Sequence, residues 1–229
     1  MKCLKDMDMM DKRLITGIGS LNFNTVEESI HFTTKFDIPF LPQLPHLEGN
    51  MIDQMNSLTS LSLIEFSKIE AQKVKIQIPG PISSDLNIDA IKEYFLFLYR
   101  TLKHKELIIF VDEPYLPEIN QELEELISFI RQFGECGLHS CSKRIVDLKK
   151  LNLDYYSFDA SLEERLDYGQ AKTLVIGIIP TDKKYDIEKL KKIKLDDRRV
   201  LLSPACGLAD KGLDSYQILK DLLYLKANI

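Results

Sequence analysis

The chain has 229 residues, of which 45% are hydrophobic, and a formal net charge of −5. This length predicts one large domain, residues 1–229, with a well-buried core and with residues 1–12 as a flexible or capping segment. No apolar run approaches the roughly 20 residues that span a bilayer, and the charged start MKCLKDMDMMDKR lacks the hydrophobic stretch of a signal peptide. We therefore expect a cytoplasmic protein that does not bind membranes. Because basic residues are dispersed rather than gathered in a stripe, we also expect no nucleic-acid binding.

Short apolar runs alternate with amphipathic stretches along the chain. The apolar runs predict strands at 13–21, 38–44, 74–80, 106–114, 136–142, 155–161, 173–181 and 199–207. The amphipathic stretches predict helices at 25–36, 88–104, 119–133, 145–151, 185–193 and 215–227. Thr25, followed three residues later by Glu28, predicts a capping box at the start of the first helix.

Eight strands that alternate with helices indicate an α/β protein with a parallel sheet, and eight is the number that closes a (β/α)8 TIM barrel. Because such barrels usually need about 250 residues, we predict a compact single barrel with trimmed loops and helices. The alternative is an open doubly wound sheet. Such sheets usually carry a glycine-rich phosphate-binding turn after the first strand, and GIGSLNF (17–23) lacks the full pattern, which favours the barrel.

A histidine and two cysteines form the pattern that is most specific for chemistry. His139 and Cys141 are two residues apart in GLHSCS (137–142), so a strand would place them on one face. Cys206 lies where the apolar run of VLLSPACGLAD (200–210) gives way to a loop. Taken singly, a free cysteine is more often a small buried hydrophobe. Zinc, however, takes imidazole nitrogen and thiolate sulfur, so the joint pattern favours a zinc site.

Polar residues follow several other predicted strands, and the carboxyl ends of barrel strands meet at one rim, where barrel active sites are built. Asp112 and Glu113 come directly after the apolar IIFV, and Asp159 follows the run YYSF. We therefore expect them to share a pocket with the histidine and cysteines. The alternative for Asp112 and Glu113 is to cap the following helix.

Several strings occur in order along nearly the whole chain: TGIGSL (16–21), FLPQLP (40–45), IQIPGPIS (76–83), IIFVDEP (108–114), GLHSCS (137–142), YSFDAS (156–161) and LSPACGL (202–208). Together they resemble the C-terminal catalytic barrel of cobalamin-independent methionine synthase and its short single-barrel relatives. That superfamily also contains the uroporphyrinogen decarboxylases and zinc-dependent methyltransferases that act on methylated corrinoids. The His-x-Cys pair, the distant CGL and the DEP triplet are the most specific elements.

The resemblance implies a ligand set for a catalytic zinc ion, Zn(2+). His139, Cys141 and Cys206 match the family's histidine and two cysteine ligands. Asp159 falls where the family has a glutamate ligand, which makes it the predicted fourth ligand with a side chain one methylene shorter.

The resemblance also implies a binding site for homocysteine. Asp112 matches an acidic residue that contacts the amino group, and Asp53, in NMIDQM (50–55), matches a second amine-binding residue that is a glutamate in the family. Gly19 and Ser20 match a backbone segment at the carboxylate. Glu113, beside Asp112, completes the predicted substrate site.

The predicted chemistry is methyl transfer to a thiol. A free thiol has a pKa near about 8.5, whereas a thiol that ligates zinc is deprotonated, so zinc would make the nucleophile. The chain has no tryptophan and one barrel, which favours a methylcorrinoid, free or on a corrinoid protein, over folate as methyl donor. The alternatives are the same chemistry on another thiol, such as coenzyme M, and a catalytically degenerate barrel that binds zinc or a small ligand.

Overall fold

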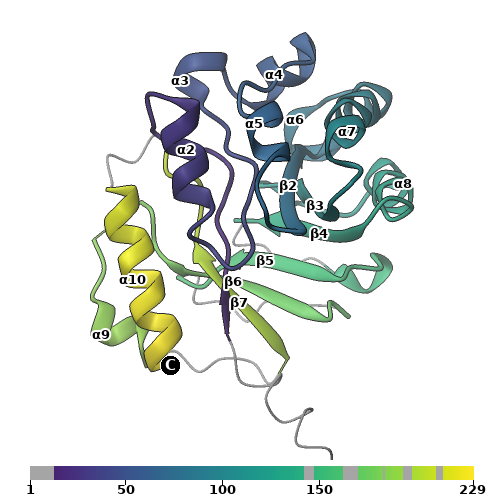
Figure 1. Ribbon diagram of the computed structural model, residues 1–229. Coiled ribbons are helices and arrows are strands. Elements are labelled where there is room, and N and C mark those ends of the chain that lie inside the picture. The colour runs from purple at the N-terminus through teal and green to yellow at the C-terminus, as the bar shows by residue number, and fades with distance from the viewer. Residues whose placement is uncertain (1–12, 142–146, 162–169, 183, 193–197, 210–213) are drawn as a thin grey trace, which may run out of the picture.

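The architecture is a strongly curled parallel sheet with helices outside it, as the computed structural model shows for residues 13–141, 147–161, 170–182, 184–192, 198–209 and 214–229 (Figure 1). The predicted N-terminal segment 1–12 lies outside the described residues. The sheet has seven strands in the order β1-β7-β6-β5-β4-β3-β2. The strands are β1 (Leu14–Ile15), β2 (Lys73–Pro79), β3 (Glu106–Asp112), β4 (Glu135–Ser140), β5 (Tyr155–Asp159), β6 (Thr173–Ile179) and β7 (Arg199–Pro204).

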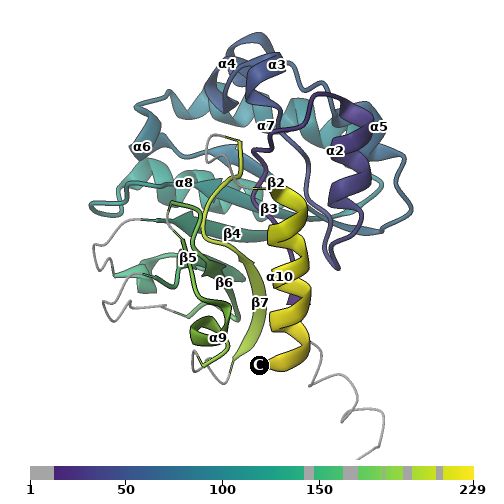
Figure 2. The ribbon, with the colours of Figure 1, turned by 90° about the vertical axis from the view of Figure 1, so that its left-hand side faces the viewer.

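Helices connect the strands and cover the outer face of the sheet (Figures 1 and 2). The longer helices are α2 (Val26–Thr33), α7 (Ile88–Leu102), α8 (Gln121–Ile130) and α10 (Ser215–Asn228). The shorter ones are α3 (Pro45–Glu48), α4 (Met51–Ser57), α5 (Leu63–Ser67), α6 (Pro81–Ser84), α9 (Ile187–Leu190) and a 3-10 turn, η1 (Leu148–Lys150). Within the described ranges, no helix is both long and apolar enough to cross a bilayer.

The α/β class and the parallel alternation are confirmed, but the closed eight-stranded barrel is wrong. Predicted strand 38–44 makes only isolated bridges. On one side the Ile38 N–H donates to the Ile15 carbonyl (3.2 Å), and on the other the Leu41 N–H donates to the Lys75 carbonyl (2.9 Å). The sheet is therefore an open half-barrel whose edges, β1 and β2, flank this segment.

Proline is the physical reason why segment 38–44 forms no strand. Pro39 and Pro42 have no N–H, so each removes a donor that a continuous ladder needs, and proline is confined to edges and bulges of sheets. The apolar composition of the segment still draws it into the core, where Phe40 and Leu41 are buried. An apolar run predicts burial, but it does not show whether the buried segment also forms the continuous hydrogen bonds of a strand.

The ends of the predicted elements differ from the observed ones in a few places. The first predicted strand, 13–21, shortens to β1, and the predicted helix 145–151 is described only from residue 147, where it contains η1. Thr25 caps α2 by accepting a hydrogen bond from the Glu28 N–H (3.2 Å), which is one half of the predicted capping box. Helices α3 to α6 were not predicted, because each is too short for a clear amphipathic period.

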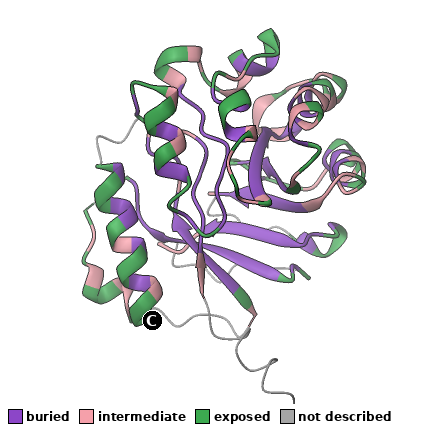
Figure 3. Cartoon of the chain, in the orientation of Figure 1, coloured by how far each residue is buried: buried purple, intermediate pink, exposed green. Residues whose placement is uncertain are grey.

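Both faces of the sheet are buried, as Figure 3 shows along most of the strands. A large core joins the outer face to the helices. A smaller cluster lies on the inner side of the curl and consists of Ile38, Ile108, Phe110, Tyr155, Val175 and Leu201. Burial on both faces explains why the strands read as nearly continuous apolar runs.

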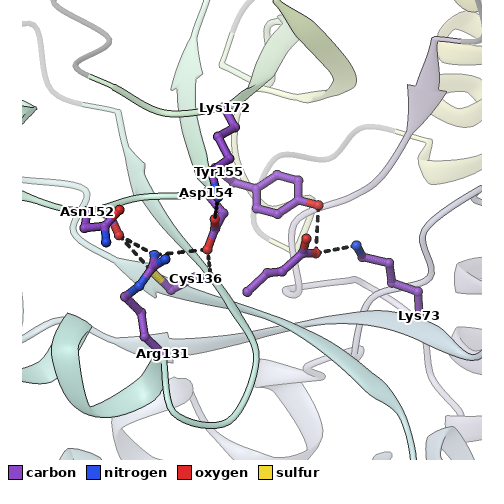
Figure 4. A network of polar contacts seen from close by, with 8 residues as sticks. Lys73, Arg131, Cys136, Asn152, Asp154, Tyr155 and Lys172 are labelled. Carbon is purple, nitrogen blue, oxygen red and sulfur yellow. Dashed lines mark hydrogen bonds and ion pairs between the residues drawn. The ribbon is translucent and has the colours of Figure 1, made fainter. Parts of the chain in front are cut away.

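Ion pairs and hydrogen bonds gather at the amino ends of the strands (Figure 4). Asp154 accepts from Arg131 (3.0 Å), Lys172 (2.8 Å) and the backbone N–H of Cys136 (3.2 Å). These charges lower the pKa of Asp154 against the effect of its burial. The network ties β4 to the segment before β5, at the end of the sheet opposite to the predicted site.

Candidate metal centre

Strand periodicity places the predicted site on the inner face of the sheet, at its carboxyl edge. Phe110 belongs to the inner cluster, so Asp112, two residues later on β3, lies on the same face. Asp112 is in register with His139 on β4, and His139 with Ser157 on β5. These polar side chains form one row across three neighbouring strand ends.

Cys206 reaches this row from the turn after β7. The turn packs closely over β6, since a Cβ atom at Gly177 would lie 2.6 Å from the Cα of Ala205 and 2.8 Å from the carbonyl oxygen of Phe158. Glycine is therefore required at 177 for the turn to approach. This close approach lets a residue 65 positions beyond Cys141 meet it at the edge of the curled sheet.

The structure brings His139, Cys141 and Cys206 into direct contact. The Nε2 atom of His139 lies 2.8 Å from the Sγ of Cys141. The thiols of Cys141 and Cys206 are hydrogen-bonded to each other, and His139 is hydrogen-bonded to Cys206 as well. His139 is buried, while both cysteines are half-buried. The three residues singled out by sequence thus form one cluster.

The two thiols have opposite electrostatics. Hydrogen bonds from Cys141 and then from His139 lower the pKa of Cys206, because they stabilise its thiolate. The hydrogen bond to Cys206, together with burial, raises the pKa of Cys141. The cluster therefore favours a single negative charge, carried by Cys206, with Cys141 as a proton donor.

Ser157 orients the histidine, and sequence reasoning missed it. Its Oγ lies 2.9 Å from the Nδ1 of His139, and both side chains are buried. This contact leaves Nε2 for the cysteines, in the manner of groups that fix a ligating imidazole from its far side. The sequence did contain a sign of this role, because the alternation of the predicted strand 155–161 places residue 157 on the same face as Asp159.

Asp112 lies against the cluster as a half-buried residue at the end of β3. Its Oδ1 is 3.9 Å from the Nε2 of His139 and is a buried oxygen with no hydrogen-bond partner. Burial raises the pKa of Asp112, and the nearby His139 partly opposes that rise. A carboxyl oxygen without a partner is an acceptor available to a cationic or N–H group of a ligand.

The donor types suit zinc, although the structure does not hold them at the spacing of a zinc site. With Zn–N near 2.05 Å and Zn–S near 2.3 Å, two ligands of a tetrahedral ion stand about 3.6 Å apart. The His139 and Cys141 donors are 2.8 Å apart, so they would have to separate by less than about 1 Å. In the described ranges, no group of three or more His, Cys, Asp or Glu residues already has the spacing of a metal site. Zinc ligation is a prediction that rests on the chemistry of the donors.

Asp159 is near the cluster, and its role as fourth ligand stays a prediction. Its charge is the smallest of the contributions that raise the pKa of Cys141. One of its oxygens, Oδ1, accepts a hydrogen bond from the backbone N–H of Ser161 (2.7 Å). The side chain is half-buried.

Two predicted substrate contacts have other partners. Glu113 is buried, and its two oxygens accept from the backbone N–H groups of Ile82 (2.8 Å) and Ser83 (2.6 Å) at the start of α6. It caps a helix, as the alternative proposed, but the helix follows β2 rather than β3. Asp53 is exposed and accepts from the Asn50 N–H (2.9 Å) in a capping box at α4.

Gly19 and Ser20 lie beside the turn that carries Cys206, and three of their backbone groups have hydrogen-bond partners. The Gly19 N–H donates to Gln77 Oε1 (2.8 Å), and the Ser20 carbonyl accepts from Leu208 (2.8 Å). The Ser20 hydroxyl packs against Gly207, where a Cβ atom would lie 1.9 Å from it. These residues fix the turn that carries Cys206, so a carboxylate at Gly19 would have to displace Gln77.

A buried lysine beneath the site was also missed by sequence reasoning. The Nζ of Lys75 donates to the carbonyl of Gly17 (2.7 Å) and to Gln77 Oε1 (3.2 Å), and it lies 4.6 Å from the centre of the Phe110 ring. Burial lowers its pKa to about 7. The alternation of side chains along β2 places Lys75 and Gln77 on the inner face, and this alternation could have predicted their burial.

Comparison with known proteins does not identify the chain. No family model matches it, and no curated protein matches its sequence. Fold and site together define an α/β protein with an open, curled parallel sheet that carries one histidine and two cysteines in contact at its carboxyl edge.

Proposed function

We propose that this protein is a zinc-dependent thiol methyltransferase that transfers a methyl group to homocysteine and forms methionine. The observation that carries the proposal is the contact of His139 with Cys141 and Cys206, from two distant strand ends. Zinc at these ligands would hold the substrate thiol as a thiolate. Two protein thiolates donate more charge than histidines do, which suits a sulfur nucleophile better than water activation.

The protein residues would bind and orient the substrate. Ser157 holds the imidazole of His139 so that Nε2 faces the sulfur atoms. The unpartnered Oδ1 of Asp112 is the acceptor for the ammonium group of homocysteine. With the amino acid fixed at one end, its sulfur can be presented in line with a methyl donor.

The proposed donor is a methylcorrinoid, free or on a corrinoid protein. The chain has no tryptophan for stacking on a pterin. Transfer to a thiol of the coenzyme M type is the second candidate, since the ligand set would be the same. Asp112 favours homocysteine, because a sulfonate thiol carries no ammonium group for a carboxylate to bind.

Metal analysis of the purified protein tests the site. We expect near-stoichiometric zinc in the wild type and in Cys136→Ser, and a large loss in Cys141→Ser and Cys206→Ser. Cys136 is the matched control because it is buried at the amino end of β4, where its sulfur meets Arg131 (3.4 Å). Equal zinc in all four proteins, or zinc in none, contradicts the proposal.

A two-by-two assay tests the reaction. Zinc-loaded protein is incubated with homocysteine or coenzyme M and with methylcobalamin or methyltetrahydrofolate, and the methylated thiol is measured by mass spectrometry. We expect turnover with homocysteine and methylcobalamin. Turnover with folate alone excludes the corrinoid donor, and zinc binding without any turnover supports a degenerate barrel that binds zinc or a small ligand.

A further inference from the structure

The contact between Cys141 and Cys206 has a chemistry of its own, apart from metal binding. Both are free thiols, and they are hydrogen-bonded to each other across the carboxyl edge of the sheet. A disulfide bond has an S–S distance of about 2.05 Å and joins residues whose sulfurs can face each other, as the two sulfurs in this hydrogen bond do. Residues on two separate strand ends are thus already placed for a covalent link.

We propose that Cys141 and Cys206 form a reversible intramolecular disulfide when the protein meets a hydroperoxide. The proposal rests on the contact of the two sulfurs and goes beyond the proposed methyl transfer, which needs both as thiolates. Oxidation and zinc ligation would compete for the same atoms.

The surroundings of the three described cysteines make the reaction selective. Cys141 and Cys206 are half-buried, so a small peroxide can reach them. Cys136 is fully buried at the other end of β4. Its sulfur is hydrogen-bonded to Arg131 and to the carbonyl oxygen of Asn152. Peroxide therefore cannot reach Cys136, and no second thiol among the described residues contacts it.

The first step is oxidation of Cys206. Its sulfur attacks one oxygen of hydrogen peroxide, an S–O bond forms, the O–O bond breaks, and sulfur gives up two electrons. The released hydroxide takes up a proton by way of His139, which is hydrogen-bonded to Cys206, and leaves as water.

The second step closes the disulfide. The sulfur of Cys141 attacks the sulfenic sulfur of Cys206, an S–S bond forms, and the S–O bond breaks. The hydroxide leaves as water with the thiol proton of Cys141. In sum, two thiols and one hydrogen peroxide give one disulfide and two waters, and an added dithiol such as dithiothreitol reverses the link.

Peptide mapping tests the proposal. The full chain, freed of metal with a chelator and reduced, is treated with stoichiometric hydrogen peroxide, digested without reduction and analysed by mass spectrometry. We expect the loss of two titratable thiols and a peptide pair that joins Cys141 to Cys206, both reversed by dithiothreitol. Cys136→Ser should behave like the wild type. Cys3, which lies outside the described residues, is covered by a Cys3→Ser variant with the same expected result.

Other outcomes overturn the proposal. The proposal fails if both thiols remain free after peroxide treatment, or if either forms a disulfide with another cysteine. It also fails if Cys206 is overoxidised without a disulfide bond. In Cys141→Ser the first step should still occur, and dimedone should label Cys206. A parallel sample loaded with zinc separates the two proposals. If the disulfide forms but the protein binds no zinc, only the proposed function is excluded. If the protein binds zinc but the metal-free sample forms no disulfide, only this inference is excluded.

Discussion

The Nδ1 atom of His139 lies 2.9 Å from the Oγ of Ser157, and neither side chain is exposed. The hydroxyl fixes which imidazole nitrogen faces the cysteines. We therefore expect Ser157→Ala to weaken zinc binding about tenfold, the lower end of what loss of such a partner costs. Competition with a chelator of known affinity measures the change.

Ser203 provides the matched control for Ser157. It is equally buried, on β7, and its Oγ has no hydrogen-bond partner. Ser203→Ala should leave zinc affinity unchanged and stability equal or higher, because it removes an unsatisfied hydroxyl. If Ser157→Ala and Ser203→Ala change zinc affinity equally, Ser157 has no orienting role.

Glu113 is expected to act on stability. Its carboxylate satisfies two backbone N–H groups, of Ile82 and Ser83, in a buried place. Glu113→Ala leaves both donors without a partner, so we expect a loss of about 2–4 kcal/mol in the free energy of unfolding, with a smaller loss in Glu113→Gln. Urea denaturation measures it. Glu118→Ala, at an exposed position, should stay within about 0.5 kcal/mol of the wild type.

Much of the fold follows from local patterns. Strands β2 to β7 each begin within one residue of the predicted start, because each is an apolar run bounded by turn residues. Segment 38–44 has the same composition, and its failure to pair fully depends on where Pro39 and Pro42 fall against the hydrogen bonds of its neighbours. Closure of the sheet is a question of register, which local composition does not encode.

The site divides in the same way. Parallel strand ends share one edge, so the meeting of His139 with Cys206 could be predicted from sequence. The role of Glu113 could not be predicted, because the N–H groups that it binds belong to α6, which follows β2 and not β3. The capping role of Asp53 could have been predicted from Asn50, three residues earlier. The family resemblance instead suggested that Asp53 binds substrate.

Asp37 joins the two ends of the described chain. It accepts from the backbone N–H of Ile15 (2.7 Å) and from Lys226 of α10 (2.7 Å). Asp37→Ala should lower the free energy of unfolding by about 1–2 kcal/mol, because it leaves the N–H of an edge strand unpaired. Lys226→Ala removes a partly exposed ion pair and should cost less than about 1 kcal/mol. Equal losses in the two variants would show that the ion pair, and not the backbone bond, carries the effect.

Lys75 should make stability depend on pH in the alkaline range. Burial lowers its pKa from 10.5 to about 7 in the folded protein, so between these values the unfolded chain binds one proton more than the folded one. The free energy of unfolding from this group therefore rises with pH through that window, by up to about 1.4 kcal/mol per pH unit, and is independent of pH below it. Lys75→Met should remove this slope, while Lys68→Met, at an exposed position, should keep it. Urea denaturation at pH 6, 7, 8 and 9 compares the three proteins, and parallel slopes in wild type and Lys75→Met would mean that Lys75 is charged in the folded state throughout.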